Sequence, residues 1–123
     1  MANLFEEADP VEASYAVRPD TDVSISVVIG NGQFGTIRVR LDGNKIAAGR
    51  QQVTAVLGKG STVTNKTVDV ISVVDDVNPS TNRTVVTYTL AGGAAPQSFQ
   101  SDLNLANDWG VALHTATFQL AKL

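Results

Sequence analysis

Cysteine is absent from the 123-residue sequence, which excludes disulfide bonds and thiolate metal sites. Charge is also scarce, since charged residues make up 17% of the chain, where about 25% is typical of globular proteins. The net charge is -3 and no cluster of basic residues is present, the nearest approach being Arg38 and Arg40. Binding to a phosphate backbone needs clustered basic side chains, so we expect no nucleic-acid partner.

Long apolar runs are missing as well. No stretch approaches the roughly 20 apolar residues that cross a bilayer. The N-terminus carries Glu6 and Glu7, whereas a secretory signal peptide carries positive charge there. We therefore expect no membrane partner. For the chain as given we expect a cytoplasmic location, which includes a particle that assembles in the cytoplasm.

Short alternating stretches rich in β-branched residues fill most of the chain. A cluster of Gly, Asn, Asp or Pro interrupts the alternation about every ten residues, which is typical of serial antiparallel strands. Residues 46–57 also fit a helical period roughly, but their flanking glycines favour a strand. The pattern predicts about eight strands, at residues 11–17, 23–29, 36–41, 52–57, 62–74, 83–90, 99–105 and 111–120.

A chain of this length folds as one domain around one core. Each strand must bury one face, so we predict an all-β fold, an antiparallel β-sandwich of the Ig-like or jelly-roll kind. A closed barrel is the alternative. We assign residues 1–10 to an N-terminal arm and residues 11–123 to a single β-sandwich domain.

The apolar alternation changes phase at two places. In residues 62–74 the apolar positions shift from even to odd at Val70–Ile71, and in residues 111–120 they shift from odd to even around His114–Thr115. An extra residue in one strand produces such a shift, so we predict a β-bulge at each place. Burial of both faces would also explain the first pattern.

The single histidine, His114, is the natural candidate for a general base or a metal ligand. No second histidine and no G-x-S-x-G motif accompany it, although a catalytic triad can assemble from scattered positions. We expect His114 to be a partly exposed strand or bulge residue, and we expect that the protein is not an enzyme. The glycine-rich segment 30–35 precedes a strand, whereas phosphate-binding loops lead into a helix, so we expect no phosphate site there.

Two segments gather the oxygen ligands that calcium accepts. They are Asp75, Asp76, Asn78 and Asn82 in the first segment and Asp102, Asn104, Asn107 and Asp108 in the second. Neither matches an EF-hand, and Asp and Asn are also the residues of tight turns. We prefer turns and expect no cofactor, and leave open whether Asp75, Asp76 and Asn78 bind calcium.

Trp109 is the only tryptophan of the chain, and it follows Asn107 and Asp108. An exposed aromatic ring with polar neighbours is what sugar binding by stacking requires. Trp109, Asn107 and Asp108 are therefore candidates for contact with a ligand, and carbohydrate is a possible partner.

The N-terminal arm holds a second set of contact candidates. Leu4 and Phe5 are apolar residues in an otherwise unanchored segment, and such residues are often buried on a neighbouring subunit. Glu6 and Glu7 follow them, and we interpret this pair as solvated charge in a mobile arm.

These observations favour a non-catalytic binding or assembly module. Serial strands expose sheet edges, which can pair with other chains, so we expect protein subunits as partners and a homo-oligomer. The protein would then be a structural component of a larger particle such as a virion, a phage tail or a secretion apparatus. The alternative is a carbohydrate-binding β-sandwich centred on Trp109.

Overall fold

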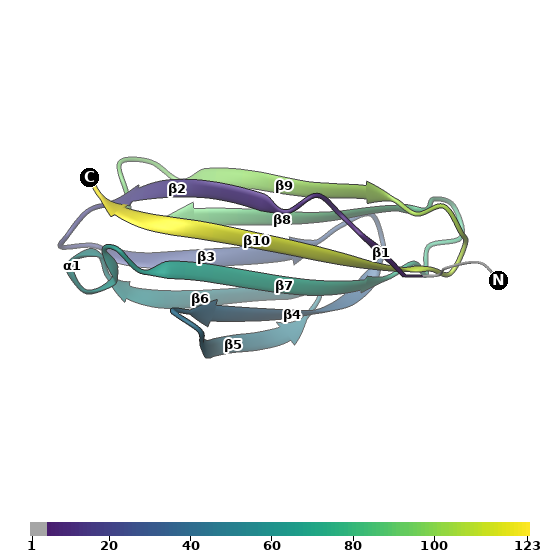
Figure 1. Ribbon diagram of the computed structural model, residues 1–123, viewed down its shortest axis with the longest axis horizontal. Coiled ribbons are helices and arrows are strands. Elements are labelled where there is room, and N and C mark those ends of the chain that lie inside the picture. Colours follow the sequence, from purple (N-terminus) through teal and green to yellow (C-terminus); the bar gives the residue numbers. More distant parts are fainter. Residues whose placement is uncertain (1–4) are drawn as a thin grey trace.

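Ten β-strands and one short helix make up residues 5–123, the part of the chain that the computed structural model describes (Figure 1). Leu4 lies outside the described residues. The helix has four residues, and no helix among the described residues is long and apolar enough to span a membrane. The elements are β1 (Phe5–Glu7), β2 (Val11–Val17), β3 (Asp22–Ile29), β4 (Phe34–Leu41), β5 (Asn44–Arg50), β6 (Gln52–Lys59), α1 (Gly60–Val63), β7 (Thr67–Asp75), β8 (Arg83–Ala91), β9 (Gln97–Asn104) and β10 (Val111–Lys122).

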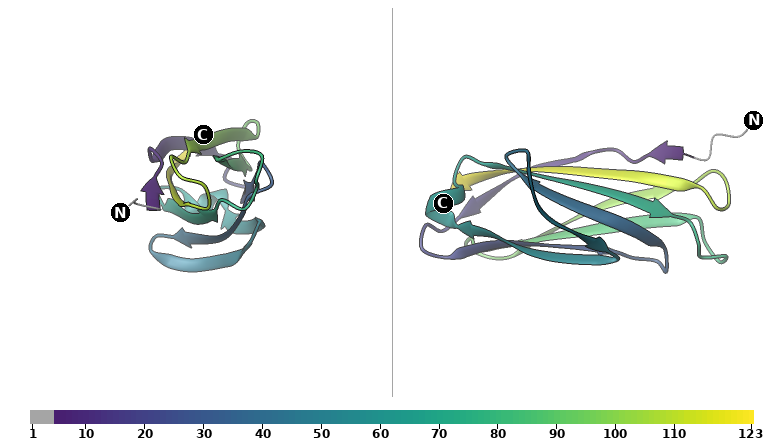
Figure 2. Two further views of the ribbon diagram at one scale, coloured as in Figure 1. Left: turned by 90° about the vertical axis from the view of Figure 1, so that its right-hand side faces the viewer. Right: turned by 90° about the horizontal axis from the view of Figure 1, so that it is seen from below.

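The strands form two sheets that pack face to face. In sheet A the order is β1-β10-β7-β4-β5, and β2 also pairs with β10. In sheet B the order is β6-β3-β8-β9. Figures 1 and 2 show the two layers running along the long axis, and they do not close into a barrel. The predicted β-sandwich is confirmed, with ten strands instead of about eight because β1 and β5 are additional.

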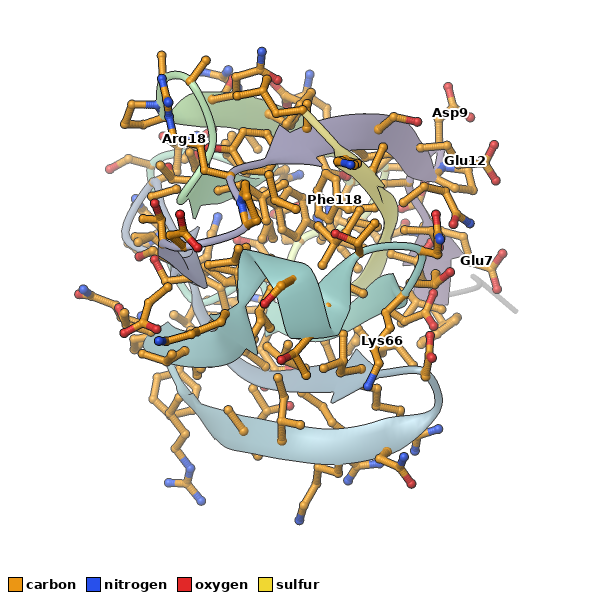
Figure 3. All side chains as sticks on the ribbon, turned by 90° about the vertical axis from the view of Figure 1, so that its left-hand side faces the viewer. Glu7, Asp9, Glu12, Arg18, Lys66 and Phe118 are labelled. Carbon is orange, nitrogen blue, oxygen red and sulfur yellow. The ribbon has the colours of Figure 1, made fainter. Side chains whose placement is uncertain are left out.

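The core lies between the two sheets and is built by the alternation that the sequence predicts. In β3, the odd-numbered residues from Val23 to Ile29 are buried and their even-numbered neighbours are more exposed. Phe118 of β10 crosses the interior, where its ring lies 5.7 Å from the Tyr88 ring and 5.2 Å from the Phe99 ring (Figure 3). These ring contacts join β10 of sheet A to β8 and β9 of sheet B.

Both predicted bulges are wrong. β7 pairs with β4 and with β10 without a register shift, and β10 runs unbroken from Val111 to Lys122. Polar residues occupy inward positions in both strands: Ser72 and His114 are fully buried, whereas Ile71 is exposed on the outer face. The register shifts are elsewhere, between Val23 and Ser24 where β3 pairs with β6, and at Val39/Arg40 where β4 pairs with β5.

The strand interpretation of residues 46–57 is confirmed over the helical one, whereas the strand predicted at residues 62–74 is shorter than expected. Residues 46–57 belong to β5 and β6, and Gln51 between these strands has a φ of 65°. The long strand predicted at 62–74 begins only at Thr67, because residues 60–63 form α1. At Gly60 an added Cβ would lie 1.8 Å from the Arg18 carbonyl oxygen, so only glycine fits this close approach.

The N-terminal segment is anchored from Phe5 onward. β1 pairs in parallel with residues 111–113 of β10, and the Ala8 amide donates a 2.9 Å hydrogen bond to the Leu113 carbonyl. The Glu6 carboxylate accepts a 2.8 Å hydrogen bond from the Ala106 amide. The expectation of an unanchored arm is therefore wrong from Phe5 onward, and Glu6 is held by a hydrogen bond, whereas Glu7 is exposed as expected of a solvated charge.

Leu120 of β10 and Leu123, which directly follows this strand, provide a matched test of the inward position of Leu120. Leu120 is 2% exposed and Leu123 is 54% exposed. We expect Leu120→Ala to lower the free energy of unfolding by about 2–5 kcal/mol, because it removes buried methyl groups and leaves a cavity. We expect Leu123→Ala to change it by less than about 0.5 kcal/mol. Urea unfolding measures both, and equal effects of the two substitutions would contradict the inward position of Leu120.

Candidate functional site: a pocket at the loop end of the sandwich

Two loops that are far apart in the sequence meet at one end of the sandwich. Residues 76–82 join β7 to β8, and residues 105–110 join β9 to β10, at the right-hand end of Figure 1 and facing the viewer on the left of Figure 2. The Asp76 amide donates a 2.9 Å hydrogen bond to the Gly110 carbonyl, and the Leu105 amide donates one of 2.9 Å to the Asn82 carbonyl. These backbone bonds fix the two loops side by side.

A pocket of about 180 Å³ lies between the two loops. We call it the loop-end pocket. It combines residues of both segments that the sequence identifies as rich in oxygen ligands, together with the tryptophan. Its lining residues are Asp76, Asn78, Pro79, Asn82, Asp108 and Trp109.

Gln33 holds the first of these loops in place. Its side chain is 1% exposed, and its amide oxygen accepts hydrogen bonds from the Val77 and Asn78 amides at 2.8 and 3.0 Å. Its amide nitrogen donates to the Thr81 and Arg83 carbonyls, both at 3.1 Å. Sequence reasoning missed Gln33, although it lies two residues before Gly35 on the inward phase of β4. That phase is the signal that could have identified it.

Asp76 is the buried acid of the pocket. It continues the even-numbered inward face of β7 by one step beyond Val74, and its residue is only 3% exposed. Its carboxylate oxygen Oδ1 is buried and has no hydrogen-bond partner. Buried polar groups are nearly always hydrogen-bonded because an unmet one costs free energy. Asp76 is therefore an exception that calls for an explanation.

Trp109 is the exposed aromatic residue of the pocket. It is 65% exposed, and its backbone φ is 61°. The left-handed region is unfavourable for a bulky residue and costs on the order of 1–3 kcal/mol. Asp108 beside it lines the pocket, whereas Asn107 is half-buried in the same turn and does not line it. Two of the three residues predicted for ligand contact here thus lie together.

The remaining oxygen ligands of the two segments lie outside the loop-end pocket. Asp75 is exposed at the end of β7, and Asn104 is exposed at the end of β9. Asp102 forms an ion pair with Arg83 across the β8–β9 pair. The Arg83 guanidinium, by hydrogen bonding to the Asp102 carboxylate, lowers the pKa of that carboxyl group. The structure therefore divides the second candidate segment and keeps only Asp108 at the pocket.

His114 is fully buried, which corrects the expectation of a partly exposed residue. Its Nε2 lies 2.8 Å from the Thr84 hydroxyl and its Nδ1 lies 2.7 Å from the Ser101 hydroxyl. The Thr84 hydroxyl donates its proton to the Leu103 carbonyl at 2.9 Å, so it must accept from Nε2–H. Ser101 then donates to Nδ1. Both ring nitrogens are satisfied between the sheets, where His114 has no surface for a substrate to reach.

The loop-end pocket combines acidic, amide and aromatic side chains. Its carboxylates can accept hydrogen bonds or a proton, its amide groups can accept and donate hydrogen bonds, and its indole ring can stack. Among residues 5–123 no group of three or more His, Cys, Asp or Glu side chains is placed to hold a metal ion. Comparison with protein-family models, curated protein sequences and solved structures found no match.

Burial of the His114 ring predicts a pH dependence of stability. Desolvation lowers the pKa of His114 to about 4, against an opposing effect of the Asp102 charge. The unfolded chain, with a histidine pKa near about 6.5, then binds the proton more tightly than the folded protein. We expect stability to fall as the pH drops from about 6.5 to about 4, by up to roughly 3 kcal/mol.

Urea unfolding of the wild type and of His114→Gln between these pH values measures this component. The variant should lose stability at neutral pH and show a shallower decrease in acid. The Asp102 carboxyl group also titrates in acid, so the comparison uses the difference between the two proteins at each pH. A difference that is the same at all pH values would contradict a neutral, buried His114.

Proposed function

We propose that the protein is a non-catalytic binding module whose loop-end pocket binds carbohydrate. The observation that carries the proposal is the placement of an exposed Trp109 ring in one pocket with Asp108, Asn78 and Asn82. Sugars present apolar C–H faces and many hydroxyl groups. An aromatic face with carboxylate and amide neighbours complements both features.

The conformation of Trp109 supports a role in binding. A tryptophan that is 65% exposed with a left-handed backbone contributes little to the core and costs free energy. Such strain is concentrated at binding sites, where a ligand offsets it by covering the exposed ring. A purely structural tryptophan would be expected inside the sandwich, where Tyr88 and Phe118 lie.

The size of the pocket limits the ligand. Its volume of about 180 Å³ is below the roughly 300 Å³ at which sites for drug-sized molecules begin. We therefore propose one sugar ring or the end of a glycan chain as the bound unit, and not a long stretch of polysaccharide.

Substitution of the tryptophan tests this function. We expect Trp109→Ala to weaken glycan binding by about fivefold or more, since the loss of a stacked aromatic ring is worth on the order of 1 kcal/mol or more. Val56→Ala is the matched control, because Val56 is 66% exposed on β6 and lies outside the pocket. A glycan array followed by calorimetry measures binding, with thermal unfolding as a check on folding. Absence of wild-type binding across a broad array would reject the proposal.

A second function, assembly with further copies of the chain, is favoured by the charge on sheet A. One edge of this sheet carries acidic residues on and between β1 and β2; we call it the acidic edge. Figure 3 shows three of them projecting together. The opposite strands β4 and β5 carry basic residues and no acid, with Asp42 in the turn between them; we call these the basic edge. The acidic edge has Glu6, Glu7, Asp9 and Glu12, and the basic edge has Arg38, Arg40, Lys45 and Arg50.

The acidic edge of one copy would pair with the basic edge of the next copy, in a head-to-tail contact. A contact of this kind repeats from copy to copy and produces rings or filaments, in keeping with a structural component of a larger particle. Phe34 and Ile71 are exposed on the outer face of sheet A, and Phe5 is 45% exposed beside the acidic edge. These apolar residues would add buried area to the charge pairing.

Charge reversal on the surface is the test of assembly. Deleting the N-terminal residues would remove β1 and so change sheet A itself. We expect a defined oligomer at low salt by light scattering. Lys45→Glu combined with Arg50→Glu should weaken association by about tenfold or more, because surface ion pairs each contribute up to about 1 kcal/mol. Lys59→Glu combined with Lys66→Glu is the control outside the basic edge. A wild type that stays monomeric at all concentrations would reject assembly.

A further inference from the structure

We propose that the loop-end pocket also binds a divalent cation, with calcium as the expected metal and the Asp76 carboxylate as its buried ligand. This inference extends the proposed binding function of the same pocket, but it does not require that carbohydrate be the other ligand. It follows from the state of Asp76 and from the chemistry of the groups around it.

Asp76 lacks the partners that a buried carboxylate needs. The residue is 3% exposed, and its Oδ1 has no hydrogen-bond partner. Among the described residues, Arg83 and Asp102 form the one ion pair. Asp76 therefore has no cationic side chain within ion-pair distance. A buried carboxylate oxygen that has neither a hydrogen-bond donor nor a cation beside it is unfavourable. A bound cation would remove the penalty.

The other pocket residues supply further oxygen ligands. Asp108 brings a second carboxylate and Asn82 brings an amide group, while the Asn78 amide oxygen, which accepts a 3.0 Å hydrogen bond from the Ser80 amide, keeps its second lone pair. Two carboxylates balance the charge of one divalent ion. A set made only of oxygens favours a hard cation over zinc or copper, which prefer histidine and cysteine. His114 is buried between the sheets and already has two partners.

Calcium fits this set better than magnesium. Calcium accepts six to eight oxygens in variable geometry, including amide oxygens and water, whereas magnesium requires a strict octahedron. The two loop carboxylates, with amide oxygens and water, are therefore enough ligands for a weak calcium site. With so few charges we expect a dissociation constant on the order of 0.1–1 mM, as in weak calcium sites.

The loop that carries Asp76 is already ordered for binding. Gln33 fixes the Val77 and Asn78 amides, and the Asn78 side chain bonds to the Asn31 carbonyl at 2.7 Å and to the Ser80 amide at 3.0 Å. A ligand site that needs little reordering loses less free energy on binding. The open side of the pocket leaves coordination positions that water or ligand hydroxyls can occupy.

Calorimetric titration of chelator-treated protein with calcium chloride is the direct test. We expect wild-type binding in the range given above and at least a tenfold loss in Asp76→Asn. Asp75→Asn is the matched control, since Asp75 is the neighbouring but exposed carboxylate outside the pocket, and its affinity should stay within about twofold. Should Asp76→Asn fail to fold, Asp108→Asn at the exposed side of the pocket should show the same loss.

Two results would overturn the cation site. One is the absence of wild-type binding up to about 10 mM calcium, well above the affinity expected for weak sites. The other is an equal loss in Asp75→Asn and Asp76→Asn, which would indicate general attraction by surface charge. Magnesium should bind at least tenfold more weakly than calcium, and equal binding of the two would also contradict the proposed ligand set.

The failure of this inference is distinct from the failure of the proposed function. Calcium binding that depends on Asp76, together with no glycan binding, would support the cation site and reject carbohydrate as the ligand. Glycan binding that depends on Trp109, with no calcium binding by calorimetry, would support the proposed function and reject the cation site.

Discussion

The pairing of β10 determines most of the structure. This strand pairs with β7 on one side and with β1 and β2 on the other, in one unbroken register from Val111 to Lys122. The register directs Phe118 and Leu120 into the core and gives the N-terminal segment its backbone partners. It also places Val111 opposite Asp75, so that the loop carrying Asp108 and Trp109 enters β10 beside the start of the β7–β8 loop.

The buried polar residues differ in whether their polar atoms have hydrogen-bond partners, and this difference separates structural residues from a candidate ligand-binding residue. Gln33 and His114 are buried, and each has all the partners that its chemistry requires. Each is thus explained by the fold alone, Gln33 as the support of a loop and His114 as a link between sheets. Asp76 is equally buried but has an oxygen without a partner. The Ser72 and Tyr88 hydroxyl groups are also buried without a partner, but of these three residues only Asp76 lines the loop-end pocket, which makes that pocket the candidate site.

Local patterns predicted the strands well wherever the inward side chains are apolar. In β3 the alternation of Val23, Ile25, Val27 and Ile29 leaves one possible buried face. The same reasoning failed in β7 and β10, where Ser72 and His114 occupy inward positions. An apolarity pattern treats a buried polar residue as a phase change. The hydrogen bonds that permit the burial of His114 come from Thr84 and Ser101 on other strands.

The sequence alone determined the fold class and the turns, because both depend on residues that are neighbours in the chain. Alternation sets the strands, and pairs such as Asp42-Gly43, with φ values of 47° and 84°, set tight turns. Only the tertiary structure decided that Asp76 and Trp109 share one pocket, and that Glu6 and Lys45 lie on strands at opposite edges of sheet A. Such placements depend on strand order and register, which arise from packing between distant segments.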